Sequence, residues 1–246
     1  MTTELPDSYP TTRDALQRVA THIVARAREQ STGRFGLRAT PGGFGTPEFG
    51  DEPRRVRVSG ALLIVESGAS GAASTRTASI DGATLAELAF LAGVDLEAEL
   101  SVGHDTPPLG EVDVPITIDS VAAAAVAHWF GIVGAALDRT VAGLGPEAAP
   151  TMAQLWPEHF DVALDAAFDP SAPGERRTNL GGSAGDGFHE APYLYVGPWT
   201  DDRPGDPDLW NAPFGATLGW HAVMSTDDPV ATAAAFFQRG MAALSA

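Results

Sequence analysis

The chain has 246 residues, of which 32 are acidic and 15 basic, and its formal net charge at pH 7 is -17. A surface this acidic repels phosphate backbones and anionic lipid, so the charge argues against nucleic-acid and membrane partners. All the basic residues are arginine and cysteine is absent, which excludes lysine Schiff-base chemistry, a P-loop, disulfides and thiolate metal sites. The lack of cysteine and of a secretory signal over the first residues predicts a cytoplasmic protein.

The first predicted element is a helix over Thr12–Glu29, because apolar residues recur there at helical spacing and Gly33 follows as a stop signal. Alternation over 34–39 predicts a strand. The next segment, 41–47, is rich in glycine and proline. We expect it to be a wide connection, with a flap over a site as the alternative.

The segment Arg55–Glu66 has the pattern of a β-hairpin, with Ser59 and Gly60 as its turn. A third strand is expected over Thr75–Ile80 and a short helix over Ala83–Ala92. The segment 94–118 has little periodicity and is expected to be a long irregular connection.

The most apolar run, Val121–Leu137, is alanine-rich and about as long as the shortest membrane spans. We interpret it as a buried central helix in which His128 is a hydrogen-bonded core residue. A last helix is expected after Asp228, which suits the N-cap position before Pro229. The predicted fold class is α+β, with antiparallel meanders from both halves packed against the central and terminal helices. The prediction is one domain over 1–246, with possible halves 12–93 and 119–246.

The stretch 154–199 holds most of the side chains that are capable of chemistry. Trp156, Phe160, Val162 and Leu164 alternate with polar residues, which predicts one strand through 156–165 with a buried face. A glycine-rich loop at Gly181–Gly187 follows, and then a second strand at 193–196. Its G-x-S-x-G spacing lacks the helix that a hydrolase serine needs, so a nucleophilic serine is not predicted.

The leading functional hypothesis is a soluble protein that binds a small molecule near these two strands. The candidate ligand-binding residues are His159, Asp161, Ser183, Asp186, Tyr193 and Tyr195. No cofactor is predicted in this case. Asp161 has two possible roles, either binding backbone amides of the Gly181–Gly187 loop or lining the functional site.

The first alternative is a metal-dependent enzyme, of the non-haem iron type or with another divalent metal. His159 and Asp161 form an H-x-D triplet that, with His189 or His221, would supply two histidines and a carboxylate. The triplet resembles that of 2-oxoglutarate-dependent oxygenases. It departs from them because no Arg or Lys lies about ten residues after His221. A second alternative is a protein-interaction scaffold with partly exposed anchors at Trp156, Trp199 and Trp210.

Two segments carry a resemblance to a family. They are L-W-P-E-H-F-D-V-A-L at 155–164 and E-A-P-Y-L-Y at 190–195. They resemble an uncharacterised, mostly actinobacterial family of unknown function. They are distantly similar to a larger unknown-function family whose segments read roughly W-G-S-F-D-L-A-V and P-E-P-x-F-Y-x-Y. The resemblance implies that Phe160 and Asp161 are shared and that His159 is not, because the larger family has serine there. It implies no activity.

Overall fold

The structure is a computed structural model that describes residues 4–68, 74–100, 106–169, 171–172 and 174–245. The chain divides into two compact units. The N-terminal unit comprises Leu5–Gly131 and Leu155–Phe160, and the C-terminal unit comprises Ile132–Gln154 and Asp161–Ala246. Both contain antiparallel strands and helices, which confirms the predicted α+β class.

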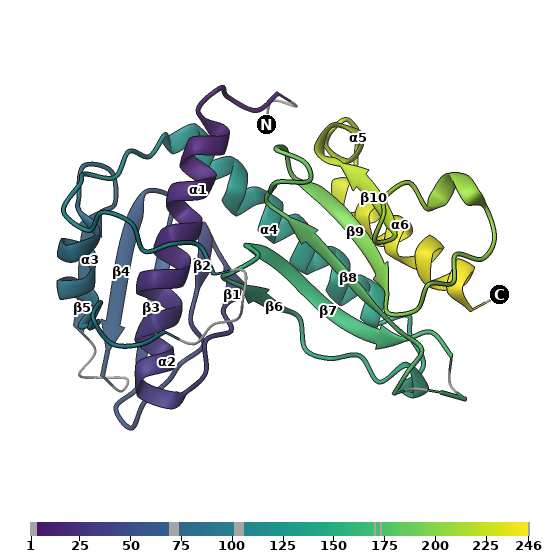
Figure 1. The fold of residues 1–246 in the computed structure, drawn as a ribbon, viewed down its shortest axis with the longest axis horizontal. Helices are drawn as coiled ribbons and strands as arrows, with labels where there is room; N and C mark the ends of the chain where they lie inside the picture. Colours follow the sequence, from purple (N-terminus) through teal and green to yellow (C-terminus); the bar gives the residue numbers. More distant parts are fainter. Residues whose placement is uncertain (1–3, 69–73, 101–105, 170, 173, 246) are drawn as a thin grey trace. The chain divides into compact units, whose positions relative to one another are not determined.

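The N-terminal unit is built on a five-stranded antiparallel meander whose spatial order follows the chain (Figure 1). Its strands are β1 (Arg38–Thr40), β2 (Gly43–Gly45), β3 (Arg54–Ser59), β4 (Leu62–Ser67) and β5 (Ser74–Ser79). The predicted hairpin is confirmed, but its turn lies at Gly60 and Ala61, because Ser59 pairs with Leu62.

The prediction that 41–47 is a wide connection is wrong, because β2 lies inside it and is buried. β2 pairs with β1 on one side and β3 on the other. A Cβ on Gly43 would lie 2.4 Å from the Val58 carbonyl oxygen, and one on Gly45 would lie 2.4 Å from the Arg57 Cβ. The glycines therefore allow close packing against β3 rather than marking a loop.

The first helical segment runs from Tyr9 to Thr32 and ends at Gly33, whose φ is +69°. It consists of α1 (Tyr9–Val19), a buried π-helical segment (Ala20–Ala25) and α2 (Arg26–Thr32). A shorter helix, α3 (Leu85–Ala92), follows the sheet.

Phe44, Phe130 and Phe160 form the aromatic centre of the N-terminal unit. Phe160 lies 5.4 Å from Phe44 and 5.1 Å from Phe130 between ring centroids, and both contacts are edge-to-face. All three side chains are fully buried. Aromatic pairs in this geometry add to the free energy gained by burial alone. Phe160 is therefore a core residue of this unit.

The second antiparallel sheet has the strand order β10-β9-β8-β7-β6. Its strands β7 to β10 lie in the C-terminal unit, whereas Leu155 and Trp156 of β6 are assigned to the N-terminal unit. The strands are β6 (Gln154–Trp156), β7 (Asp161–Ala167), β8 (Arg177–Ser183), β9 (Tyr193–Pro198) and β10 (Ala216–Gly219). The helices are the C-terminal part of α4 (Ser120–Val141), α5 (Trp220–Met224) and α6 (Pro229–Leu244), with 3-10 turns at Pro146–Ala148 and Pro207–Leu209.

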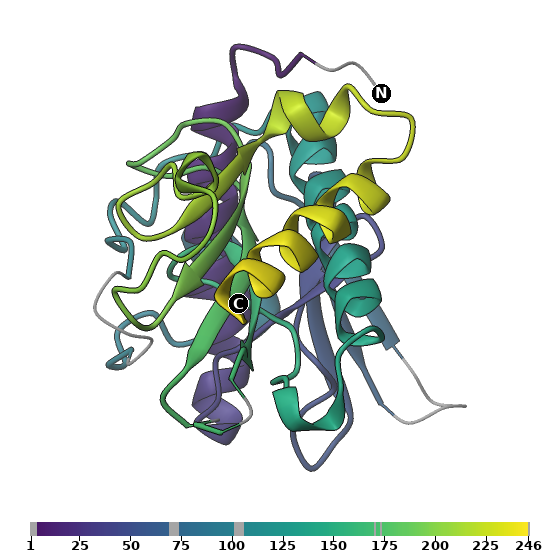
Figure 2. The ribbon, with the colours of Figure 1, turned by 90° about the vertical axis from the view of Figure 1, so that its right-hand side faces the viewer.

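Helices α4 and α6 pack on one face of this sheet (Figures 1 and 2). The packing is close, because a Cβ on Gly182 would lie 2.4 Å from a Val133 methyl group, and one on Gly240 would lie 2.7 Å from a Val196 methyl group. Among the described residues of this unit, no helix covers the opposite face of β7–β10 (Figure 2). That face carries the candidate site.

The prediction of one continuous strand over 156–165 is wrong. A turn occupies 157–160, and Phe160 has a φ of +52°, in the left-handed region that non-glycine residues rarely adopt. β7 starts only at Asp161, and nearly all of its residues are buried. The alternation that predicts a shared face for His159 and Asp161 therefore does not apply, because the left-handed residue between them breaks the two-residue period.

α4 is the one helix, among the described residues, that is long and apolar enough to cross a membrane. Of its most apolar window, 56% is buried inside the structure, and the core helix of a globular protein has the same composition. Val126 and Trp129 are fully buried. The prediction for His128 is wrong, because its side chain is exposed to solvent.

Candidate functional site

The helix-free face of the C-terminal sheet is polar. The strand register aligns Asp161, Ser183 and Tyr193 in one row across β7, β8 and β9. The next row on the same face contains Ala163, Gly181 and Tyr195. Two phenols, a hydroxyl and a carboxyl group are thus gathered at one end of the sheet by strand pairing alone.

Tyr195 on β9 reaches across β8 to β7. Its hydroxyl donates a short hydrogen bond to Oδ2 of Asp161. The ring passes over Gly181, where a Cβ would lie 2.6 Å from the Tyr195 hydroxyl and 2.8 Å from the Ala163 Cβ. The glycine therefore permits the contact between Tyr195 and Asp161, which are 34 residues apart in the chain.

The carboxyl group of Asp161 is only half satisfied. The residue is 7% exposed, and its Oδ1 is buried without a hydrogen-bond partner. Burial, opposed by the hydrogen bond from Tyr195 and reinforced by the nearby Asp186, raises the pKa of Asp161 from 3.8 to about 7. Buried polar atoms are normally hydrogen-bonded, and carboxyl groups with raised pKa values concentrate at functional sites.

Asp186 holds the glycine-rich loop in place. Its Oδ1 accepts hydrogen bonds from the backbone amides of Phe188 and His189, at 2.8 and 3.2 Å. Its Oδ2 accepts from the hydroxyls of Tyr193, at 2.6 Å, and Ser183, at 3.3 Å. Burial and the contact with Asp186 raise the pKa of Tyr193, so the phenol stays protonated and acts as a donor.

This arrangement corrects one expectation for Asp161. The predicted loop at Gly181–Gly187 is wrong in its first part, because Gly181–Ser183 belong to β8. The carboxylate that binds backbone amides in the connection after β8, those of Phe188 and His189, is Asp186, whereas Asp161 accepts its hydrogen bond from Tyr195. The role of structural anchor therefore belongs to Asp186, and Asp161 is left with spare hydrogen-bonding capacity.

Aromatic rings border the cluster on its solvent side. Phe188 lies 5.6 Å from Tyr193 and 5.0 Å from Phe214 between ring centroids. Phe188 is 49% exposed and Phe214 is 38% exposed. Tyr195 is partly exposed as well. A partly exposed aromatic surface thus adjoins Tyr193 in the cluster that contains the Asp161 carboxyl group.

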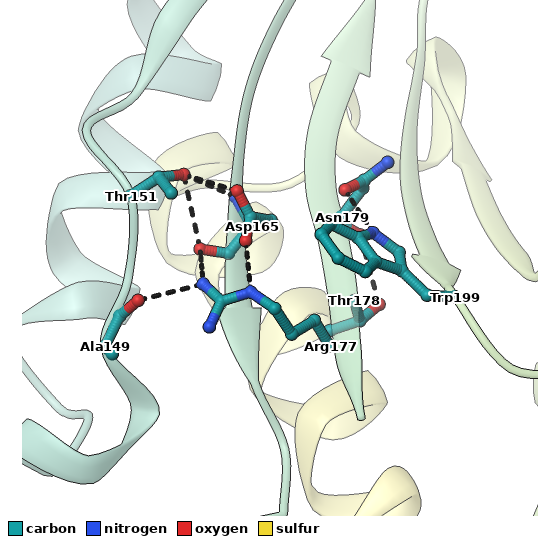
Figure 3. A network of polar contacts seen from close by, with 7 residues as sticks. All are labelled: Ala149, Thr151, Asp165, Arg177, Thr178, Asn179 and Trp199. Atoms are coloured by element: carbon teal, nitrogen blue, oxygen red, sulfur yellow. Dashed lines mark hydrogen bonds and ion pairs between the residues drawn. The ribbon is translucent and has the colours of Figure 1, made fainter. Parts of the chain in front are cut away.

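The other end of the same face carries a network that the sequence analysis missed (Figure 3). The Arg177 guanidinium forms a short ion pair with the Asp165 carboxylate and donates to the Ala149 carbonyl at 2.9 Å. Thr151 donates to Asp165 at 2.8 Å, and Trp199 donates to Asn179 at 2.9 Å. The sequence contains one signal for this network, the opposite charges of Asp165 and Arg177, and it can be recognised only when the strand register is known.

Five of the six candidate ligand-binding residues lie together, namely Asp161, Ser183, Asp186, Tyr193 and Tyr195. The sixth, His159, lies in the turn before β7 and belongs to the N-terminal unit.

The histidines considered as metal ligands have other partners. His189 Nδ1 lies 2.8 Å from the Ala191 carbonyl oxygen. His221 lies on α5, where its Nε2 is 3.4 Å from the Ser225 hydroxyl. The described part of the chain contains no group of three or more His, Asp or Glu side chains that could hold a metal ion.

The three tryptophans considered as interaction anchors differ in exposure. Trp199 is 54% exposed and lies against the Arg177 guanidinium. Trp210 is half-buried and donates to the Pro204 carbonyl at 2.8 Å. Trp156 belongs to the N-terminal unit and packs against Phe35.

A cavity of about 510 Å³ lies elsewhere in the C-terminal unit, beyond the last residues of β7. Leu144, Phe168 and Met241 contribute apolar surface to it, and Arg176 contributes a charge. That guanidinium lies 3.1 Å from the Asp169 carboxylate, so its charge is already balanced. None of the candidate site residues lines this cavity.

Comparison with known proteins adds no family to this description. No protein-family model, curated protein or solved structure matches the chain.

Proposed function

We propose that the protein binds a small molecule on the helix-free face of the C-terminal sheet, with Asp161 as the group that anchors it. The observation that carries the proposal is the unpartnered Oδ1 of Asp161, buried in a cluster whose other polar groups are bonded to one another. A ligand with a hydrogen-bond donor would satisfy this oxygen and recover the free energy lost by leaving it unpaired.

The aromatic surface supports the same proposal. Ligand sites combine apolar and aromatic walls with a few polar groups that fix orientation. Phe188, Phe214 and Tyr195 supply exposed or partly exposed rings beside the buried carboxyl group. A ligand on this face would contact these rings beside the cluster that holds Asp161.

The charge of -17 supports a neutral or cationic small molecule rather than nucleic acid or membrane as the partner, and the lack of cysteine supports a cytoplasmic setting. The positions of His189 and His221 do not support the metal-dependent alternative, because both side chains lie against other groups. Trp199 is 54% exposed, but it lies against Arg177 and bonds Asn179, which gives it a partner within the chain.

A thermal-shift screen of small hydrogen-bond donors tests the proposal. At a ligand concentration of 100 times Kd, binding adds about 2.7 kcal/mol to stability, which raises Tm by several degrees in a chain of this size. We expect hits on the parent protein and on Asp165→Asn, the matched control on the same strand and face. The same compounds should fail on Asp161→Asn. A screen without hits, or with hits that Asp161→Asn retains, would overturn the proposal.

A further inference from the structure

We infer that the ligand of the Asp161 site is a cationic amine, held by the carboxylates of Asp161 and Asp186 and by the rings of Phe188, Tyr193 and Phe214. This inference rests on the proposed function and specifies the chemical class that the site recognises.

Asp161 and Asp186 lack a countercharge among the described residues. Among the described residues, neither Asp161 nor Asp186 forms an ion pair with an arginine or histidine, although the two carboxyl groups influence one another electrostatically. Two carboxylates in one partly buried cluster repel each other, and an opposite charge relieves that repulsion. A bound cation would supply the charge that the chain itself does not.

A second carboxylate on the same face, that of Asp165, provides a comparison with Asp161. Asp165 lies on the same strand and face as Asp161 but is paired with Arg177 (Figure 3). Arg177 is the one basic residue on this face of β7–β10, among the residues that the structure describes, and Asp165 already engages it. These strands therefore offer an anionic ligand no unpaired positive charge, and Arg203, which lies at the Phe214 carbonyl, donates to backbone carbonyls.

The site also specifies the hydrogen-bond donor that a ligand must carry. The buried Oδ1 of Asp161 needs an N–H or O–H group to bond it. Phe188 and Phe214 are partly exposed aromatic rings of the kind that attract a cation through the ring quadrupole, and Tyr193 adjoins Phe188. An ammonium group with at least one N–H satisfies both demands, whereas a quaternary ammonium satisfies only the second.

The experiment compares four probes with the same ring: benzylammonium, benzyltrimethylammonium, benzyl alcohol and benzoate. Saturation-transfer NMR at millimolar probe concentration measures binding to the parent protein, Asp161→Asn, Phe188→Ala and the control Asp165→Asn. We expect benzylammonium to bind at least tenfold more tightly than benzyl alcohol and benzoate. Asp161→Asn should remove this preference, Phe188→Ala should weaken both cations, and Asp165→Asn should change neither result.

A second measurement distinguishes recognition of the ligand's charge by Asp161 from a purely structural role of this residue. Isothermal titration in two buffers of different ionisation enthalpy should show that benzylammonium releases protons near pH 7 and that benzyl alcohol does not. The reason is that a cation favours the ionised form of the Asp161 carboxyl group, which faces Asp186, Tyr193 and Tyr195.

The outcomes distinguish the two proposals. If benzyl alcohol binds in an Asp161-dependent way and benzylammonium binds no better, the proposed function stands and the amine inference is overturned. Preferential binding of benzoate overturns the inference as well. If none of the four probes binds, or if Asp161→Asn binds them all unchanged, both proposals are overturned.

Discussion

Replacing Asp161 with asparagine tests the feature on which the site depends, a carboxyl group whose ionised form is destabilised by burial. Asparagine keeps the shape and can still accept the hydrogen bond from Tyr195, but it cannot ionise. If Asp161 only served stability, the substitution should weaken the fold. Functional sites are held in locally unfavourable arrangements, so a functional Asp161 should give a more stable variant.

The magnitude follows from the pKa of Asp161. Its pKa rises from 3.8 in the unfolded chain to about 7 in the folded protein. At about 1.36 kcal/mol for each pKa unit, this shift corresponds to about 4 kcal/mol as an order of magnitude. Because the folded state holds the proton more tightly, this contribution is fully present below pH 4 and is lost as the pH rises through 7.

Asparagine does not lose this contribution, but its buried amide N–H groups cost about 1–3 kcal/mol if they find no acceptor. The variant should therefore be less stable than the parent by about 1–3 kcal/mol near pH 4, where the parent keeps its full contribution. It should become more stable than the parent by about 1–3 kcal/mol at pH 8.

Urea melts of both proteins at each pH from 4 to 8 measure the difference directly, because all other titrating groups are common to the two chains. Asp165→Asn is the control, and it should lose on the order of 1–3 kcal/mol since it leaves Arg177 without its carboxylate. A difference between Asp161→Asn and the parent that does not change with pH would refute the reasoning. A variant less stable than the parent at pH 8 would return Asp161 to a purely structural role.

Substitutions at three further positions test the packing, by urea melts and thermal melts against the parent. Phe160→Ala should cost about 3–5 kcal/mol, because it empties the centre of the aromatic cluster, and Phe160→Leu should cost less. Gly181→Ala should cost about 1–3 kcal/mol and release Tyr195 from Asp161, which would appear as a changed tyrosine absorbance. Val126→Asp should cost several kcal/mol, because the side chain is 1% exposed, and a Tm within two degrees of the parent would contradict the core role of α4.

Elements with clear local signals were predictable from the sequence. The helix ending at Gly93 begins at a capping box in which Thr84 and Glu87 bond each other's backbone amides, and its stop is a left-handed glycine. The hairpin of β3 and β4 has β-branched residues on both sides of a glycine turn. In both cases the preference of a few neighbouring residues agrees with the tertiary structure.

The failures come from contacts that are distant in sequence. Gly43 and Gly45 indicate a loop by composition, yet β2 is a strand because only glycine fits against β3. Phe160 continues an alternating pattern, yet the aromatic cluster holds it in a left-handed conformation and ends the period there. His128 lies in the most apolar run of the chain, but its position on α4 faces solvent.

In the candidate site too, local sequence patterns predicted some of the residues but not how they pair. Residue chemistry and alternation were enough to select Asp161, Tyr193 and Tyr195, because polar side chains on apolar strands are unusual. The pairing within the site depends on the register of three strands and on Gly181, which no local pattern reveals.

The contrast between Asp161 and Asp165 supports a functional role for Asp161. They lie on one strand and one face, four positions apart, and differ mainly in what surrounds them. Arg177 and Thr151 satisfy Asp165, whereas Asp161 receives a single phenol and keeps a buried oxygen unbonded. Leaving that oxygen unpaired costs on the order of 1–3 kcal/mol, a large fraction of the stability of an ordinary domain. The chain supplies an arginine for one carboxylate and none for the other, which is the arrangement expected where a ligand brings the missing charge.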